Sequence, residues 1–165
     1  MSALFRRVVQ IGLVAVVSAS PAAAQTVTAT FSANVGGIAK FSLSSNTVTF
    51  PDADPDTVPQ VPASSGPLTI TVKTRATPGS TVRLTILATD SLRSGVNTIP
   101  ATALSWTTTG AGYVGGTVNS FAAQTLGSWI DSGINVGTQN YRFQNSWTYV
   151  PGTYNVVLMY TLTAP

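Results

Sequence analysis

The chain has 165 residues, with eight Lys or Arg side chains, five acidic side chains that are all Asp, and neither Cys nor His. Without histidine or cysteine, no Ser-His-Asp triad, Cys-His pair or His/Cys zinc site is possible, and no disulfide can form. We therefore predict a protein that is not an enzyme and that needs no cofactor.

The first 24 residues have the pattern of a secretory signal peptide. Arg6 and Arg7 precede the apolar run 8–19, and the sequence Pro-Ala-Ala-Ala offers a cleavage site before Gln25. We expect a bacterial protein that is secreted or held at the cell surface, with no membrane span in the mature chain. Because the leader holds two of the eight cations, the mature net charge is 6 − 5 = +1, and no nucleic-acid partner is expected.

Alternation of apolar and polar residues dominates the chain after residue 25. Successive side chains of a strand point to opposite faces, so each alternating run predicts a half-buried strand. No run keeps a helical period, and only the segment 90–95 is compatible with one helical turn. We predict an all-β fold, an antiparallel β-sandwich of immunoglobulin-like or jelly-roll-like kind, as one domain over residues 25–165. The predicted strands include residues 27–35, 68–75, 80–88, 104–106, 141–149 and 154–164.

The segment FPDADPDTVPQVPASSGP (residues 50–67) is rich in proline and places Asp52, Asp54 and Asp56 at alternate positions. Proline fixes φ and removes a backbone donor, so this segment is predicted to be a stiff surface connection inside the domain and not a central strand. The aspartate spacing matches the first ligands of a calcium loop, but the glycine and the glutamate of such a loop are missing. We interpret the aspartates as turn-capping residues, with calcium binding as the alternative.

Two other sets of side chains are candidates for a site. Asp90 and Asp131 each precede a turn sequence, so neither is predicted to be catalytic. Tyr113 and Trp129 lie in glycine-rich segments and are expected to be the exposed aromatic pair, because most other aromatic residues share strand faces with aliphatic ones. Exposed aromatic rings can stack on a sugar, which makes a carbohydrate-binding module a further alternative.

The segment GTYNVVLMYTLTAP (residues 152–165) resembles the closing strand of bacterial WxL-domain surface proteins, which reads roughly Gly-x-Tyr-x-x-x-Leu-x-Trp-x-Leu-x-x-Pro. The segment 72–86 loosely resembles an earlier part of that family, with Val82 where the first tryptophan would stand. The resemblance implies a secreted β-sandwich held non-covalently at the cell wall, with cell-wall or other surface proteins as partners. The matching residues are Gly152, Tyr154, Leu158, Leu162 and Pro165, and Tyr160 replaces the second tryptophan.

The segment TVTATFSANV (residues 26–35), followed by Gly36-Gly37, resembles the N-terminal segment of spore coat U-like and archaic chaperone–usher pilins. In those pilins this segment inserts into the neighbouring subunit, so the resemblance implies self-assembly by strand exchange. The residues also permit a strand that folds back into its own domain. Because the segment 154–164 reads as a complete closing strand, we expect a closed and mostly monomeric domain that unfolds when residues 26–35 are deleted.

These patterns together predict a non-catalytic structural or surface-interaction protein of the cell envelope or the secreted fraction. A pilus-like subunit that donates its N-terminal strand is the alternative.

Overall fold

A computed structural model describes residues 29–165, and the expected signal peptide lies outside the described residues. Residues 35–165 form a compact unit whose regular secondary structure is almost entirely β. Its elements are β1 (Ile38–Leu43), β2 (Gln60–Pro62), β3 (Leu68–Arg75), β4 (Thr81–Ala88), β5 (Leu92–Ser94), β6 (Asn97–Ile99), a 3-10 turn (Ala101–Ala103), β7 (Leu104–Thr109), β8 (Gly116–Thr117), β9 (Gln124–Ile130), β10 (Gly133–Gln144) and β11 (Leu158–Thr163).

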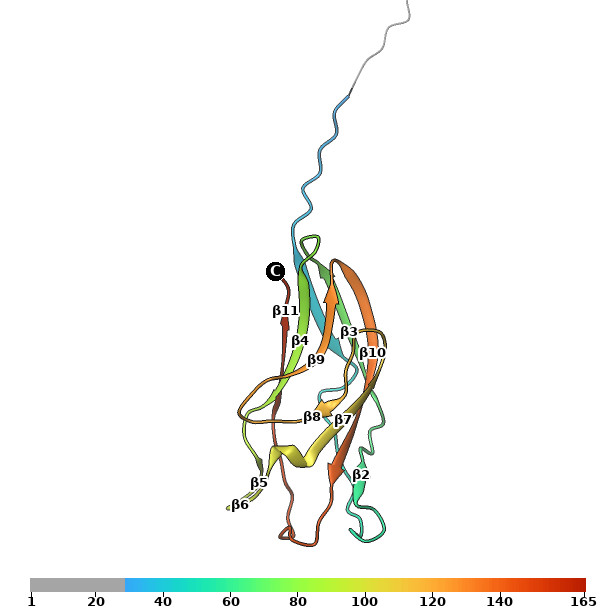
Figure 1. Cartoon of the computed structure of the whole chain (residues 1–165). Coiled ribbons are helices and arrows are strands. Elements are labelled where there is room, and N and C mark those ends of the chain that lie inside the picture. The colour runs from blue at the N-terminus through green and yellow to red at the C-terminus, as the bar shows by residue number, and fades with distance from the viewer. Residues whose placement is uncertain (1–28) are drawn as a thin grey trace, which may run out of the picture. The chain divides into compact units, whose positions relative to one another are not determined.

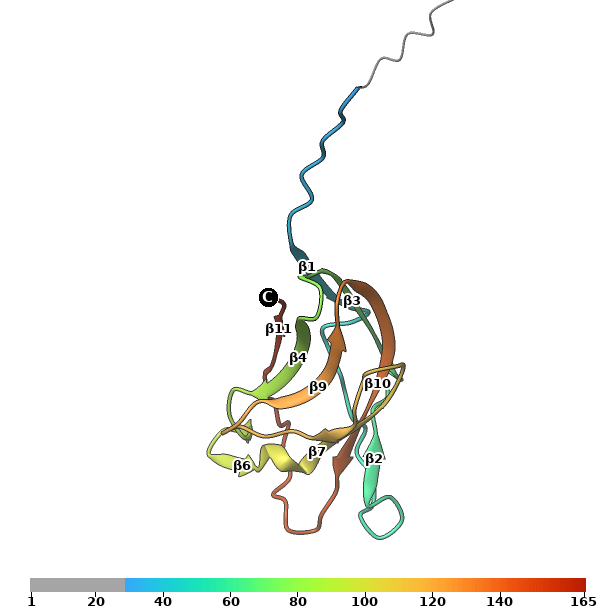
Figure 2. The ribbon, with the colours of Figure 1, turned by 45° about the horizontal axis from the view of Figure 1, so that its top comes forward.

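Two antiparallel sheets pack face to face, as the sequence predicts for an all-β sandwich. The larger sheet has the order β1-β3-β10-β7-β8, and β2 also pairs with β10. The smaller sheet has the order β11-β4-β9, and β5 and β6 form a separate hairpin. In Figure 1 the strands β11, β4 and β9 form one layer, and β3 and β10 lie in the other. Figure 2 shows the two layers from a second direction.

The core lies between β3 and β4, where the alternation is strictest. Leu68, Ile70 and Val72 on β3 are at most 4% exposed, and Leu84 and the other inward residues of β4 are almost fully enclosed. Each of these side chains gains roughly 1.5–3 kcal/mol from burial, which is the main favourable contribution to folding. The alternation of 68–75 and 80–88 therefore predicts the two central strands correctly.

The longest strand, β10, begins in a stretch whose glycines resemble a turn in the sequence. It runs unbroken from Gly133 to Gln144 and pairs with β3, β2 and β7. Gly137 is needed for close packing, because a Cβ at this position would come within 2.5 Å of the Tyr113 ring. A glycine that admits an aromatic ring looks the same in the sequence as a glycine that breaks a strand.

The structure corrects the prediction of a strand over residues 27–35. Its described part, residues 29–35, has no strand, and Gly36 and Gly37 also precede the first strand. Phe31 is 93% exposed and Val35 is 67% exposed. Apolar and polar residues do alternate in this segment, but residues 29–35 pair with no strand in the described part of the chain.

Two smaller predictions are also wrong. The segment 90–95 forms no helical turn but enters the β5–β6 hairpin, in which Gly95 takes a positive φ of 59°. Glycine adopts that backbone conformation without strain, so the hairpin is favoured locally. The strand predicted over 141–149 ends at Gln144, and residues 145–149 form a loop.

Candidate functional site

The three alternate aspartates belong to an exposed loop, which we call the acidic loop (residues 52–58). Asp54 Oδ1 accepts a hydrogen bond from the backbone N–H of Asp56 at 2.9 Å, and Asp52 Oδ1 accepts one from Ala53 N–H at 3.0 Å. Asp56 Oδ1 accepts a hydrogen bond from Trp147 Nε1 at 3.0 Å. The carboxylates are thus engaged separately, and within residues 29–165 no cluster of acidic side chains converges as a metal site would require.

The acidic loop is held rigidly against the loop that follows β10. Asn145 Nδ2 donates to the Ala53 carbonyl at 2.7 Å, and Asn145 N–H donates to the Pro59 carbonyl at 2.9 Å. Directly after it, β2 adds three residues to the edge of β10, with Val61 only 1% exposed. This short edge strand is compatible with the surrounding prolines. The segment is therefore a fixed surface connection with three carboxylates at its tip.

Tyr113 and Trp129 come together, but not as an exposed platform. Their ring centroids are 4.8 Å apart in a T-shaped arrangement, and Tyr113 is only 8% exposed. The Tyr113 hydroxyl donates to the Asn135 carbonyl at 3.0 Å, and Trp129 Nε1 donates to the Ala111 carbonyl at 2.8 Å. Burial raises the pKa of Tyr113 to about 12. The expected exposure of this pair is wrong for Tyr113, whose ring packs the glycine-rich loop onto β10.

Asp90 stabilises its own turn, and Asp131 stabilises the neighbouring turn between β3 and β4. Asp90 forms an ion pair with Arg93 at 2.6 Å, and the hydrogen bond from that guanidinium, with a second one from Ser91 N–H, lowers the pKa of Asp90. Asp131 has a positive φ of 70° and accepts a hydrogen bond from Gly79 N–H. Both positions match the predicted turn role.

The neighbouring edges of the two sheets carry a band of half-buried apolar side chains, which we call the seam. It consists of the inward side chains of residues 41–50, which include β1, and of residues 154–164, which include β11. Unlike their counterparts on β3 and β4, these side chains are only half-buried. They are Phe41, Leu43, Val48, Phe50, Tyr154, Val156, Leu158, Tyr160, Leu162 and Ala164.

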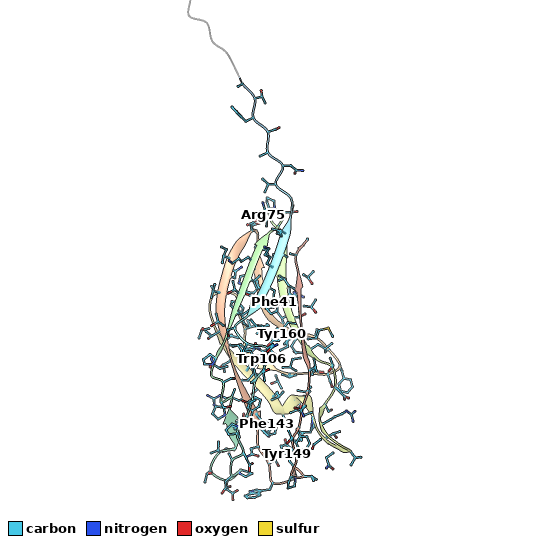
Figure 3. All side chains as sticks on the ribbon, turned by 180° about the vertical axis from the view of Figure 1, so that it is seen from behind. Phe41, Arg75, Trp106, Phe143, Tyr149 and Tyr160 are labelled. Carbon is cyan, nitrogen blue, oxygen red and sulfur yellow. The ribbon has the colours of Figure 1, made fainter. Side chains whose placement is uncertain are left out.

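The two sides of the seam meet at one aromatic contact. Phe41 on β1 stacks on Tyr160 on β11, with ring centroids 5.6 Å apart and an interplanar angle of 29°. Figure 3 shows these two residues next to each other between the strands. Among residues 29–165, β1 pairs only with β3 and β11 only with β4, so each strand presents an edge to the seam that no described strand covers.

A network of hydrogen bonds connects Tyr160 of the seam to the buried side chains of Gln139 and Tyr141. The Tyr160 hydroxyl donates to Gln139 Oε1 at 2.9 Å and shares a hydrogen bond of 2.8 Å with the Tyr141 hydroxyl. Burial raises the pKa of both tyrosines, so both stay protonated well above neutral pH. Because a buried hydroxyl is costly without a partner, the network holds the Tyr160 ring in one orientation.

The outer face of the larger sheet has a cationic end next to the first residue of β1. Lys40 lies directly opposite Lys73, and Ile38 lies opposite Arg75. We call Lys40, Lys73 and Arg75 the cationic end. Within residues 29–165 the ion pair formed is Arg93–Asp90, so these three cations have no acidic partner. They surround a shallow hollow of about 370 Å³, lined by Ile38, Lys40, Lys73, Thr74, Arg75, Ser132, Gly133 and Ile134.

The sequence predicts the residues on one side of the seam but not the seam itself. The alternation of 154–164 correctly places six side chains on one face, although only Leu158–Thr163 of the predicted strand forms β11. No pattern within one strand reports whether a neighbouring strand covers it, so the half-buried state of these side chains has no local signal. The cationic end is hidden for a similar reason, because β1 and β3 bring together cations that lie more than thirty residues apart in the chain.

No family model, curated protein or solved structure matches this chain. Among the described residues, no helix is long and apolar enough to cross a membrane. The resemblances to WxL-domain proteins and to pilins remain predictions, and so do the signal peptide and the extracytoplasmic location.

Proposed function

We propose that this protein is a non-catalytic structural subunit of the cell envelope or secreted fraction, which assembles by donating residues 26–35 to the seam of a neighbouring copy. The half-buried seam between two unpaired strand edges is the observation that carries the proposal. A strand added to an exposed sheet edge gains main-chain hydrogen bonds, and its alternate side chains fill the apolar pockets.

The donated segment fits the seam in pattern and in length. Its apolar residues occupy every second position, so all of them point to one face when the segment is extended. Residues 27–35 then span about 30 Å, and the seam residues 154–164 span about 36 Å. The apolar residues of the segment are Val27, Ala29, Phe31, Ala33 and Val35.

The backbone at Gly36-Gly37 also favours donation over folding back. A two-residue hairpin that returned the segment along β1 would need positive φ at both residues for the common type I′ turn. Neither glycine is among the residues with positive φ in the described chain. The expected closed domain therefore lacks the turn it would need, and we replace that expectation with assembly between copies.

The test compares three forms of the mature chain, starting at Gln25, by light scattering and by electrophoresis of unheated samples. We expect the wild type to form multimer ladders. Phe31→Asp places a charge on the apolar face of the segment and should leave monomers, because burying an unpaired carboxylate is prohibitive. Ser32→Asp changes the opposite face and should still assemble. A wild-type chain that stays monomeric at high concentration would overturn the proposal.

A further inference from the structure

The two ends of the sandwich carry opposite charges. β10 connects them: Gly133 pairs with Thr74 near the cationic end, and Gln144 pairs with Gln60 beside the acidic loop. The rise of a strand places these ends roughly 36 Å apart. Figure 3 shows Arg75 near one end of the sandwich and Tyr149, from the loop that holds the acidic loop, near the other.

The cationic end is electrostatically unsatisfied in a single copy. Lys40 and Lys73 face each other across neighbouring strands, and like charges in directly opposed positions are destabilising. Asp131 lies in the turn that leads into β10, but its carboxylate is taken up by the backbone N–H of Gly79. The opposite end has an excess of negative charge, because the acidic loop holds three carboxylates and none of them forms an ion pair within residues 29–165.

We infer that the cationic end of one copy docks against the acidic loop of the next, so that the chain assembles head to tail with one polarity. This inference rests on the proposed strand donation and adds the surface that sets its direction. The partner is a second copy of this chain, because the complementary charges are present on the chain itself in equal number: three cations and three aspartates.

Charge selects one of the two directions in which a strand can enter the seam. β1 runs away from the cationic end and β11 runs towards it, so a strand between them is antiparallel to one and parallel to the other. If the inserted strand is antiparallel to β11, the donor chain leaves the seam beside the acidic loop of the acceptor copy. The cationic end of the donor copy then lies next to that loop. If it is antiparallel to β1, two cationic ends meet and repel.

The connection between the donated segment and the sandwich is too short to keep the cationic end of the donor copy away from the end of the acceptor copy at which the segment leaves the seam. Only Gly36 and Gly37 separate the donated segment from β1. Two residues and their flanking bonds span at most roughly 10 Å. That length is close to the screening distance of about 8 Å at physiological salt, so the two ends must interact.

The experiment measures the rate of multimer growth of the mature chain by light scattering at low salt. The variant Lys40→Glu/Lys73→Glu should grow about tenfold more slowly, because opposed charges steer association and repelled charges hinder it. Arg142→Glu is the matched charge reversal at the other end of the same sheet: because exposed Arg142 lies close to the acidic loop, this variant adds negative charge there and should grow no more slowly than the wild type. Added salt should reduce the difference in growth rate between the Lys40→Glu/Lys73→Glu variant and the wild type.

A charge exchange makes the test specific to the contact. Asp52→Lys/Asp56→Lys alone should slow growth, and the chain that carries both double substitutions should regain most of the rate. A peptide of residues 26–35 added to any of these chains should cap growth equally, because strand donation does not use the charges. If the peptide caps growth but the charge variants all grow like the wild type, this inference is wrong and strand donation stands. If no form of the chain assembles, strand donation fails, and this inference fails with it.

Discussion

Two halves of the same hydrophobic layer are packed to different degrees. In the centre, β3 and β4 each have neighbours on both sides, and their inward side chains are enclosed. At the margin, β1 and β11 have one neighbour each in the part of the chain that the structure describes, and their inward side chains stay half-buried although they are just as apolar. The difference arises from a missing neighbour strand and not from composition, so this margin is where the fold can accept another segment.

The largest contrast should appear when a leucine is truncated on each side of this boundary. Leu84 and Leu162 are direct partners across β4 and β11, yet Leu84 is 0% exposed and Leu162 is half-buried. We expect Leu84→Ala to lower the free energy of unfolding by about 2–5 kcal/mol, because a filled core site leaves a cavity. Leu162→Ala should cost less than half as much in the monomer. Urea unfolding measures both, and equal losses would show that the seam is as well packed as the centre.

A second prediction concerns the glycines of β10. Gly137→Ala should destabilise the fold by roughly 1–3 kcal/mol, because the new methyl group would overlap the Tyr113 ring. Gly133→Ala is the matched control, since the nearest atom to its Cβ is 3.7 Å away. Thermal unfolding of the two variants compares them directly. Similar melting temperatures would mean that β10 and the Tyr113 loop are not in the close contact described here.

A third prediction uses pH to probe the enclosed part of the sandwich. Burial raises the pKa of Tyr113 to about 12 and also raises that of Tyr141. In the unfolded chain, tyrosine hydroxyls have a pKa of about 10. The unfolded state therefore loses its protons first as the pH rises. Stability should be intact below about pH 10 and fall between about pH 10 and 12. Denaturant unfolding across this range checks the slope, and Tyr113→Phe should make it shallower.

The smallest effect is expected at the acidic loop. Replacing Asp52, Asp54 and Asp56 together by Asn should change the melting temperature little, because asparagine oxygens also accept the turn hydrogen bonds. Calcium should have no effect on either form. Stabilisation of the wild type by calcium, lost in the triple variant, would instead identify a metal site through the linkage between binding and folding.

The sequence pattern predicts the sandwich and five of its strands, β3, β4, β7, the end of β10 and β11, because alternation reports directly which faces are buried. Leu68–Arg75 and Thr81–Ala88 are clear cases. The same reasoning missed the start of β10, where a glycine serves close packing, and it placed a strand in residues 29–35, whose alternation has no partner within one copy. The acidic loop was assigned correctly as a surface turn. The seam and the cationic end were not predicted, because both arise from strands that are distant in the chain.

The pairing of β1 with β3 has a mechanical consequence for a filament built in the proposed way. Tension would enter each subunit at Ile38 and run along β1, which is joined to β3 in register over six residue pairs, from Ile38–Arg75 to Leu43–Ile70. Force along a strand loads all of its ladder hydrogen bonds in shear at the same time, whereas force across a strand opens them one after another. The first strand would therefore act as a clamp that resists pulling without any covalent cross-link.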